Sequence, residues 1–221
     1  MKMRIIITIG ILALLTLITC LVWSRDHISS FPLNKPVPAA TDTSTMYKND
    51  TYGFTVRYPK QLAIDTTFQR YYHLSDTWMS EAAPDSKGVP VISIPVYRIT
   101  NKADQPYRSY PYYFDAELRI GVSTDTQDVA HCYASQFAPS ATVMINSIAF
   151  QKFSVRSAGM SQYLIAESYR TIHNNACYVI EQIKAGSSYR EAATPDDIPD
   201  TVLDAHYNAI DPIIQSFRFI R

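Results

Sequence analysis

The chain has 221 residues and carries 20 basic and 20 acidic side chains, so its formal net charge is zero. Lys2 and Arg4 precede an apolar run, and the remainder therefore has a slight excess of acidic residues. Such a chain lacks the basic patch that nucleic-acid binding requires, so we expect no nucleic-acid partner. Its length is enough for one hydrophobic core and too short for two ordinary soluble domains beside an N-terminal segment.

The first feature along the chain is an uninterrupted apolar run over residues 5–23. A helix needs about 20 such residues to cross a bilayer whose hydrocarbon core is about 30 Å thick. The leading cations favour a cytoplasmic N-terminus, which predicts an inner-membrane anchor with the domain facing the periplasm or the cell exterior. Two alternatives stay open: residues 17–20 resemble a lipoprotein processing site, with Cys20 as the candidate lipidated residue, and a signal peptide would be cleaved elsewhere.

Composition then divides the chain. Residues 1–24 are expected to form the membrane anchor or signal segment. Residues 25–45 are rich in Pro, Ser and Thr and have no apolar period, which is typical of an extended, semi-rigid linker. Residues 46–221 are left as one domain.

The domain opens with a predicted β-hairpin. Residues 52–59 read YGFTVRYP and place an aromatic or aliphatic side chain at every second position, which is the period of a strand with one buried face. Residues 49–51 supply turn chemistry that leads back to a short strand at residues 46–48. Pro59 ends the second strand because proline has no N–H for a ladder.

More strands are expected over residues 90–99, 117–123, 143–155, 163–171, 177–183 and 217–220. Pro95 predicts an edge position or a bulge, and Asn174-Asn175 predicts a tight turn. Helical spacing predicts a helix region over residues 124–137 and another over 197–215, where Pro212 either breaks the helix or begins a second short one. The pattern predicts an α+β fold, with a mostly antiparallel sheet flanked by helices and preceded by one transmembrane or signal segment.

Two cysteines, Cys132 and Cys177, lie in the domain. In an oxidising compartment an isolated pair is most simply a disulfide, and two buried free thiols are the alternative. A free thiol next to an imidazole would be a nucleophile. A thiol-dependent hydrolase or transferase that uses Cys132 or Cys177 with His131 or His173 is therefore the alternative function.

The segment at residues 107–114, YRSYPYYF, is the most suggestive binding feature. Tyr and Arg dominate binding hot spots because they bury a large area at a low entropic cost. The candidate binding residues are therefore Tyr107, Arg108, Tyr110, Tyr112 and Tyr113. The alternative is that alternate aromatic residues of a strand fill the core.

Other chemistry is weakly indicated. The sequence has no zinc-ligand spacing, phosphate loop or dinucleotide fingerprint, so we predict no metal and no cofactor. Asp115 and Glu117 share one face of a strand. We interpret them as charges on an exposed face rather than as an acid–base pair.

Tyr47-x-Asn49 with residues 52–59, and the closing phrase IIQSFRF at residues 213–219, resemble the two ends of PsbP-like domains and of uncharacterised exported bacterial proteins of that type. Residues 158–162 and 169–178 resemble a subset of the bacterial members. Leu62 departs from the pattern, since members often have Trp there. The resemblance implies an antiparallel sheet flanked by helices and a role in assembly or binding without catalysis.

Together these observations predict a membrane-tethered domain outside the cytoplasm. Its expected role is the non-catalytic binding or assembly of a protein or an envelope component. Its contact with the membrane is expected through residues 5–23.

Overall fold

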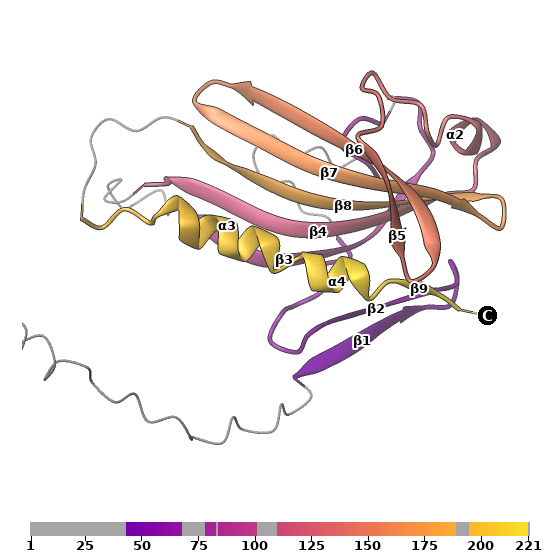
Figure 1. The fold of residues 1–221 in the computed structure, drawn as a ribbon, viewed down its shortest axis with the longest axis horizontal. Helices are drawn as coiled ribbons and strands as arrows, with labels where there is room; N and C mark the ends of the chain where they lie inside the picture. The colour runs from indigo at the N-terminus through magenta and orange to yellow at the C-terminus, as the bar shows by residue number, and fades with distance from the viewer. Residues whose placement is uncertain (1–42, 68–77, 83, 101–109, 189–194, 221) are drawn as a thin grey trace, which may run out of the picture. The chain divides into compact units, whose positions relative to one another are not determined.

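Two antiparallel sheets account for most of the described residues in the computed structural model (Figure 1). The described residues are 43–67, 78–82, 84–100, 110–188 and 195–220. The predicted anchor at residues 1–24 and nearly all of the predicted linker at residues 25–45 lie outside them. Within the described ranges, no helix is long and apolar enough to cross a membrane.

The smaller sheet joins the two ends of the domain. Its strands are β1 (Ser44–Asn49), β2 (Phe54–Pro59) and β9 (Arg218–Phe219), in the order β1-β2-β9. The predicted hairpin is confirmed, since β1 and β2 pair in antiparallel register. Asn49 shapes the turn by accepting a hydrogen bond from the Tyr52 N–H through its side-chain oxygen at 2.8 Å.

The larger sheet has six strands in the order β3-β4-β8-β7-β6-β5. They are β3 (Val89–Thr100), β4 (Tyr113–Ser123), β5 (Ala141–Ile145), β6 (Ile148–Gly159), β7 (Gln162–His173) and β8 (Ala176–Ser187). Turns of two residues join β5 to β6, β6 to β7 and β7 to β8, and both residues of each turn have positive φ. The predicted tight turn at Asn174-Asn175 is one of these.

Proline shapes the edge strand β3 as the sequence predicts. The register between β3 and β4 shifts between Pro90 and Ile92 and again between Pro95 and Tyr97. Because proline cannot donate to a ladder, it is tolerated at an edge or a bulge, and β3 provides both.

The α+β prediction is wrong, because the fold is mostly β. The described residues contain three helices: α2 (Thr126–Ala130), α3 (Asp200–Asn208) and α4 (Asp211–Gln215), of which only α3 exceeds five residues. The helix region predicted over residues 124–137 shrinks to the single short helix α2. Its N-cap is Asp125, whose carboxylate accepts from the N–H groups of Gln127 and Asp128. Short segments rarely form a helix by propensity alone. After α2, the Cys132–Cys177 disulfide and the bond from Arg170 to the Ala134 carbonyl hold the chain on the sheet instead.

The two faces of the larger sheet bury different residues. Tyr178 and Ile180 of β8 belong to the main core, together with Leu203 of α3 and Ile213 of α4. The alternate residues of the strand, Cys177 and Val179, turn to the opposite face, where they pack with Trp78 and Met79. We call these the helix face and the groove face. Figure 1 shows α3 and α4 lying along the first of them.

Trp78 packs so closely on the groove face that the residue of β4 beneath it, Gly121, has no room for a side chain. A Cβ atom built on Gly121 of β4 would lie 2.5 Å from the Trp78 carbonyl oxygen and 3.1 Å from its Cβ. Backbone atoms cannot move aside as a flexible side chain can. Gly121 therefore sets the depth at which the segment carrying Trp78 sits on the sheet.

We predict that Gly121→Ala lowers the free energy of unfolding by about 1–3 kcal/mol, because overpacking forces the backbone to shift. Urea unfolding followed by tryptophan fluorescence measures the change. Gly159→Ala is the matched control, since a Cβ there meets nothing within 4 Å. Equal stability of the two variants would contradict the packing argument.

Candidate functional site

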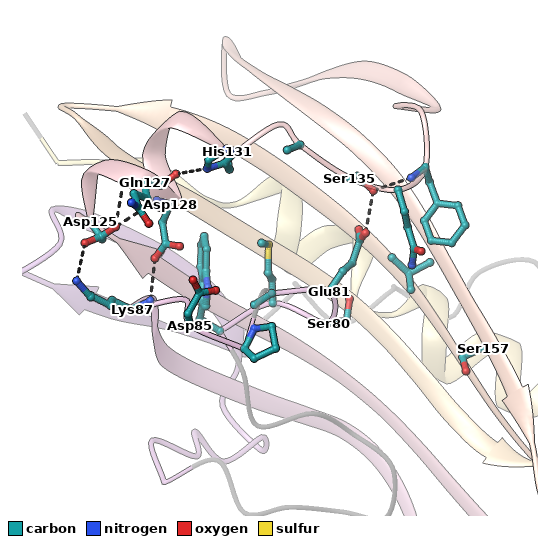
Figure 2. Close-up of a pocket in the computed structure, with 18 of the residues that line it drawn as sticks. Ser80, Glu81, Asp85, Lys87, Asp125, Gln127, Asp128, His131, Ser135 and Ser157 are labelled. Atoms are coloured by element: carbon teal, nitrogen blue, oxygen red, sulfur yellow. Dashed lines mark hydrogen bonds and ion pairs between the residues drawn. The ribbon is translucent and has the colours of Figure 1, made fainter.

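A groove of about 920 Å³ opens on the groove face of the larger sheet (Figure 2). One wall is formed by residues 78–82 and 84–87, and a second by α2 with residues 131–137. The third is β6, which contributes Val155, Arg156 and Ser157. We refer to this space as the groove.

A disulfide joins the α2 wall to the sheet. Cys132 and Cys177 are bonded, with their Cα atoms 5.6 Å apart, and neither residue is exposed. The predicted disulfide is thus confirmed. Because both sulfurs are in one bond, neither is available as the nucleophile of the thiol-dependent alternative, and the His131 ring instead contacts the Gln127 carbonyl at 2.8 Å.

Asp128 connects the first two walls. Its carboxylate accepts hydrogen bonds from the Ser123 hydroxyl at 2.6 Å, the Ser86 hydroxyl at 3.1 Å and the Lys87 N–H at 3.0 Å. Lys87 also reaches Asp125 at 3.4 Å. Figure 2 shows the Lys87 side chain directed toward Asp125, while its backbone N–H is bonded to Asp128. The segment at residues 78–87 is therefore held to α2 at one end of the groove.

Glu81 and Arg170 connect the walls at the other end. Glu81 forms an ion pair with Arg170 and accepts from the Ser135 hydroxyl at 2.8 Å. Arg170 also donates to the Ala134 carbonyl at 2.8 Å, and its guanidinium lies 4.3 Å from the centre of the Phe153 ring. The arginine is completely buried, so these contacts replace the water it has lost.

A row of buried charges lies on the same face of the larger sheet, along β4. Asp115, Glu117 and Arg119 alternate along β4, and each is at most 5% exposed. Arg98 of β3 pairs with Asp115 at 3.0 Å, and Arg119 pairs with Glu117 at 2.6 Å. Our interpretation of Asp115 and Glu117 as an exposed charged face is wrong, because this face is covered and the charges neutralise one another.

Burial dominates the electrostatics of these carboxyl groups. It raises the pKa of Asp115 to about 6, with a further increase from the neighbouring Glu117 carboxylate and an opposing decrease from Arg98. Burial also raises the pKa of Glu181, although the N–H and hydroxyl of Ser80 both donate to that carboxylate, at 2.7 and 2.9 Å. Glu181 thus anchors Ser80, and with it the first wall, to β8.

The predicted binding residues that the structure describes, Tyr110, Tyr112 and Tyr113, are not among the residues that line the groove. Tyr107 and Arg108 lie outside the described residues. The Tyr110 hydroxyl donates to the Ser187 carbonyl at 2.6 Å, and the Tyr113 N–H donates to the Ser187 hydroxyl at 2.9 Å. The ring of Tyr112 lies edge-on to that of Tyr110, 5.9 Å between centres.

Tyr110 and Tyr113 thus fasten the start of β4 to the end of β8. Burial raises the pKa of the Tyr113 hydroxyl above its usual value. A binding role for this aromatic segment stays a prediction. So does lipidation of Cys20, which lies outside the described residues.

The groove was not anticipated from the sequence. Its lining residues Glu81, Asp128 and Val155 come from segments far apart in the chain, and Glu81 is held by Arg170 from yet another strand. The available signal was the presence of charged residues inside strands of otherwise alternating pattern, as at Arg119, Arg170 and Glu181. Among the described residues, no group of three or more His, Cys, Asp and Glu is placed to hold a metal ion.

No protein-family model matches the chain, and no curated protein matches it. Among solved structures, it is similar to the solution structure of cyanobacterial PsbP (CyanoP) from Synechocystis sp. PCC 6803. The match covers 85% of this chain and 99% of that chain, with 10% sequence identity and a TM-score of 0.36. The similarity to the PsbP-like fold is distant and concerns the fold alone.

We predict that the side-chain carboxyl of Asp115 titrates with a midpoint near pH 6 in an NMR titration, compared with about 3.9 for an ordinary aspartate. Glu117→Gln should lower this midpoint and Arg98→Gln should raise it, because they remove a repelling and an attracting charge. The stability contributed by Asp115 falls as the pH rises from about 4 to about 6, since the folded carboxyl keeps a proton that the unfolded one has lost. A midpoint near 4 in the unsubstituted protein would contradict this environment.

We also predict that alkylation of the natively folded chain leaves Cys132 and Cys177 unmodified until a reductant and a denaturant are added. Peptide mapping by mass spectrometry distinguishes them from Cys20. The double variant Cys132→Ser/Cys177→Ser should lose at most about 4 kcal/mol of unfolding free energy, because a long loop is no longer closed. Labelling of either residue before reduction would restore the thiol hypothesis.

Proposed function

We propose that this protein is a membrane-tethered binding module that holds a segment of another protein in the groove, outside the cytoplasm and without catalysing a reaction. The apolar run at residues 5–23 supports the tether, and the proline-rich residues 25–45 support a spacer between membrane and domain. The Cys132–Cys177 disulfide supports an oxidising compartment, such as the periplasm or the cell exterior.

The observation that carries the proposal is that the groove is already formed, with walls fastened to one another. The disulfide, the Asp128 carboxylate and the Glu81–Arg170 pair each join two segments that border it. Fixed walls lose little conformational entropy when a ligand arrives, and this is the main way in which a preformed surface gains affinity.

The chemistry of the lining supports a protein ligand. Met79, Ala82, Pro84, Phe137 and Val155 provide apolar surface within the groove. Charged groups surround this surface, and several are already paired, such as Glu81 with Arg170 and Asp125 with Lys87. An apolar centre with a polar rim is the usual anatomy of a protein-binding surface. Catalysis by an acid–base pair would require charged groups that face a substrate, whereas these charged groups are bonded to one another.

We predict that a photo-cross-linking amino acid at position 137 captures one discrete partner in living cells of the source organism. Phe137 lines the groove and is 39% exposed, so a side chain there can reach a bound segment. The same amino acid at Met46 of β1, which is 52% exposed and outside the groove, is the matched control. Gel shift and mass spectrometry identify the adducts.

The captured protein should then bind the purified full-length chain, and Phe137→Ala should weaken that affinity about tenfold, as for a residue at the apolar centre of an interface. Met46→Ala should leave it unchanged. Equal cross-linking from both positions, or no adduct from position 137, would overturn the proposed function.

A further inference from the structure

The wall of the groove formed by β6 is an open strand edge. β5 pairs with β6 only as far as Lys152, whose register partner is Ala141. Beyond it, residues 153–159 of β6 pair with β7 on one side, and no described residue pairs with their other side. In Figure 1 this part of β6 forms the margin of the sheet after β5 has turned away.

The direction of the backbone groups along this edge follows from the ladder. The Lys152 carbonyl accepts a hydrogen bond from the Ser140 N–H at 2.8 Å, on the side away from β7. Backbone groups alternate in direction along a strand, so those of Ser154, Arg156 and Ala158 also point away from β7. As far as the described part of the chain shows, three alternate donor–acceptor positions have no strand partner on this side. Such unpaired positions are the main-chain requirement for strand addition.

The two sides of this edge differ in chemistry. On the groove face, Val155 and Ser157 border the groove, with Met79 and Phe137 nearby in its lining. Arg156 borders the groove as well, but strand alternation directs its side chain to the helix face. There it borders a second cavity of about 530 Å³, whose lining also holds Lys152 and Lys184. Those two lysines have their own partners, Glu167 at 3.4 Å and Asp204 at 2.7 Å. Among the described residues, no carboxylate forms an ion pair with Arg156.

We propose that an extended segment of the partner protein pairs with residues 154–158 as a seventh strand of the larger sheet. This rests on the proposed function and specifies its mode of binding. The segment places an acidic side chain opposite Arg156, on the helix face. Its two neighbouring side chains are apolar and enter the groove beside Val155 and Ser157. Main-chain bonds supply affinity, and the alternating side chains supply specificity.

A second copy of this chain does not fit the edge equally well. Antiparallel pairing of residues 154–158 about a two-fold axis centres on Arg156 and places it directly opposite its symmetry mate. Like charges at directly opposed positions destabilise a strand pair. An exposed charge is also a common protection against unspecific edge pairing, so Arg156 both rejects a second copy and selects an acidic partner.

The experiment uses the full-length chain in detergent and a synthetic probe, the peptide acetyl-Thr-Val-Glu-Val-Thr-amide. Amide hydrogen exchange, measured by NMR, is followed at single residues. The peptide should slow exchange at Ser154, Arg156 and Ala158. It should leave Val155 and Ser157 unchanged, because their N–H groups already bond to β7. The same peptide N-methylated at its glutamate, which removes the central donor, should have no effect.

A charge exchange tests the side-chain part of the proposal. A peptide with Lys in place of Glu should bind about threefold more weakly, in line with the energy of one cross-strand charge pair. The variant Arg156→Glu should reverse this preference. No slowing of exchange at the three edge amides, or slowing that grows with protein concentration when no peptide is present, would overturn strand addition by a partner.

The two proposals fail separately. If position 137 captures a partner and that partner leaves the edge amides unprotected, the groove binds protein by another mode. If the peptide protects the edge but position 137 captures nothing, strand addition is an intrinsic property of the edge and the proposed function is wrong.

Discussion

The groove face depends on one guanidinium group that has no contact with solvent. Arg170 is completely buried, and a charge in that position is tolerated only when it is paired and hydrogen-bonded. Its partners are the Ser168 hydroxyl on its own strand, the Ala134 carbonyl after α2, and the Glu81 carboxylate from the segment before β3. Satisfying this one side chain therefore brings two connecting segments, one before β3 and one after α2, together on the sheet.

The same logic extends along the sheet. Arg119 of β4 and Glu181 of β8 are register partners, and Glu181 in turn receives both donors of Ser80. The main core lies on the helix face, whereas on the groove face paired charges accompany smaller apolar clusters and help to decide which segments lie there. Buried ion pairs add little net stability, but breaking one is costly, and so they fix a single arrangement of the walls.

Sequence reasoning succeeded where a signal is local. The hairpin at residues 46–59, the turn at Asn174-Asn175 and the bulge at Pro95 each rest on alternation or turn chemistry within a few residues. The Cys132–Cys177 pair was found because no other cysteine competes in the domain.

The groove was missed because its residues meet only through the sheet order. The helix region at 124–137 was overestimated, since apolar spacing there serves one turn of helix and a disulfide. No local signal showed that Tyr110 and Tyr113 form hydrogen bonds with Ser187 at the end of β8, and the binding role of their segment stays a prediction.

The three two-residue turns have a consequence for the order in which the sheet assembles. Strands β5 to β8 neighbour one another in chain order, so each new pairing closes a minimal loop and costs little entropy. β4, by contrast, pairs with β8 across more than fifty residues, so that this pairing closes a long loop. The later half of the chain is thus the template on which the earlier half is organised, a direction opposite to that of synthesis.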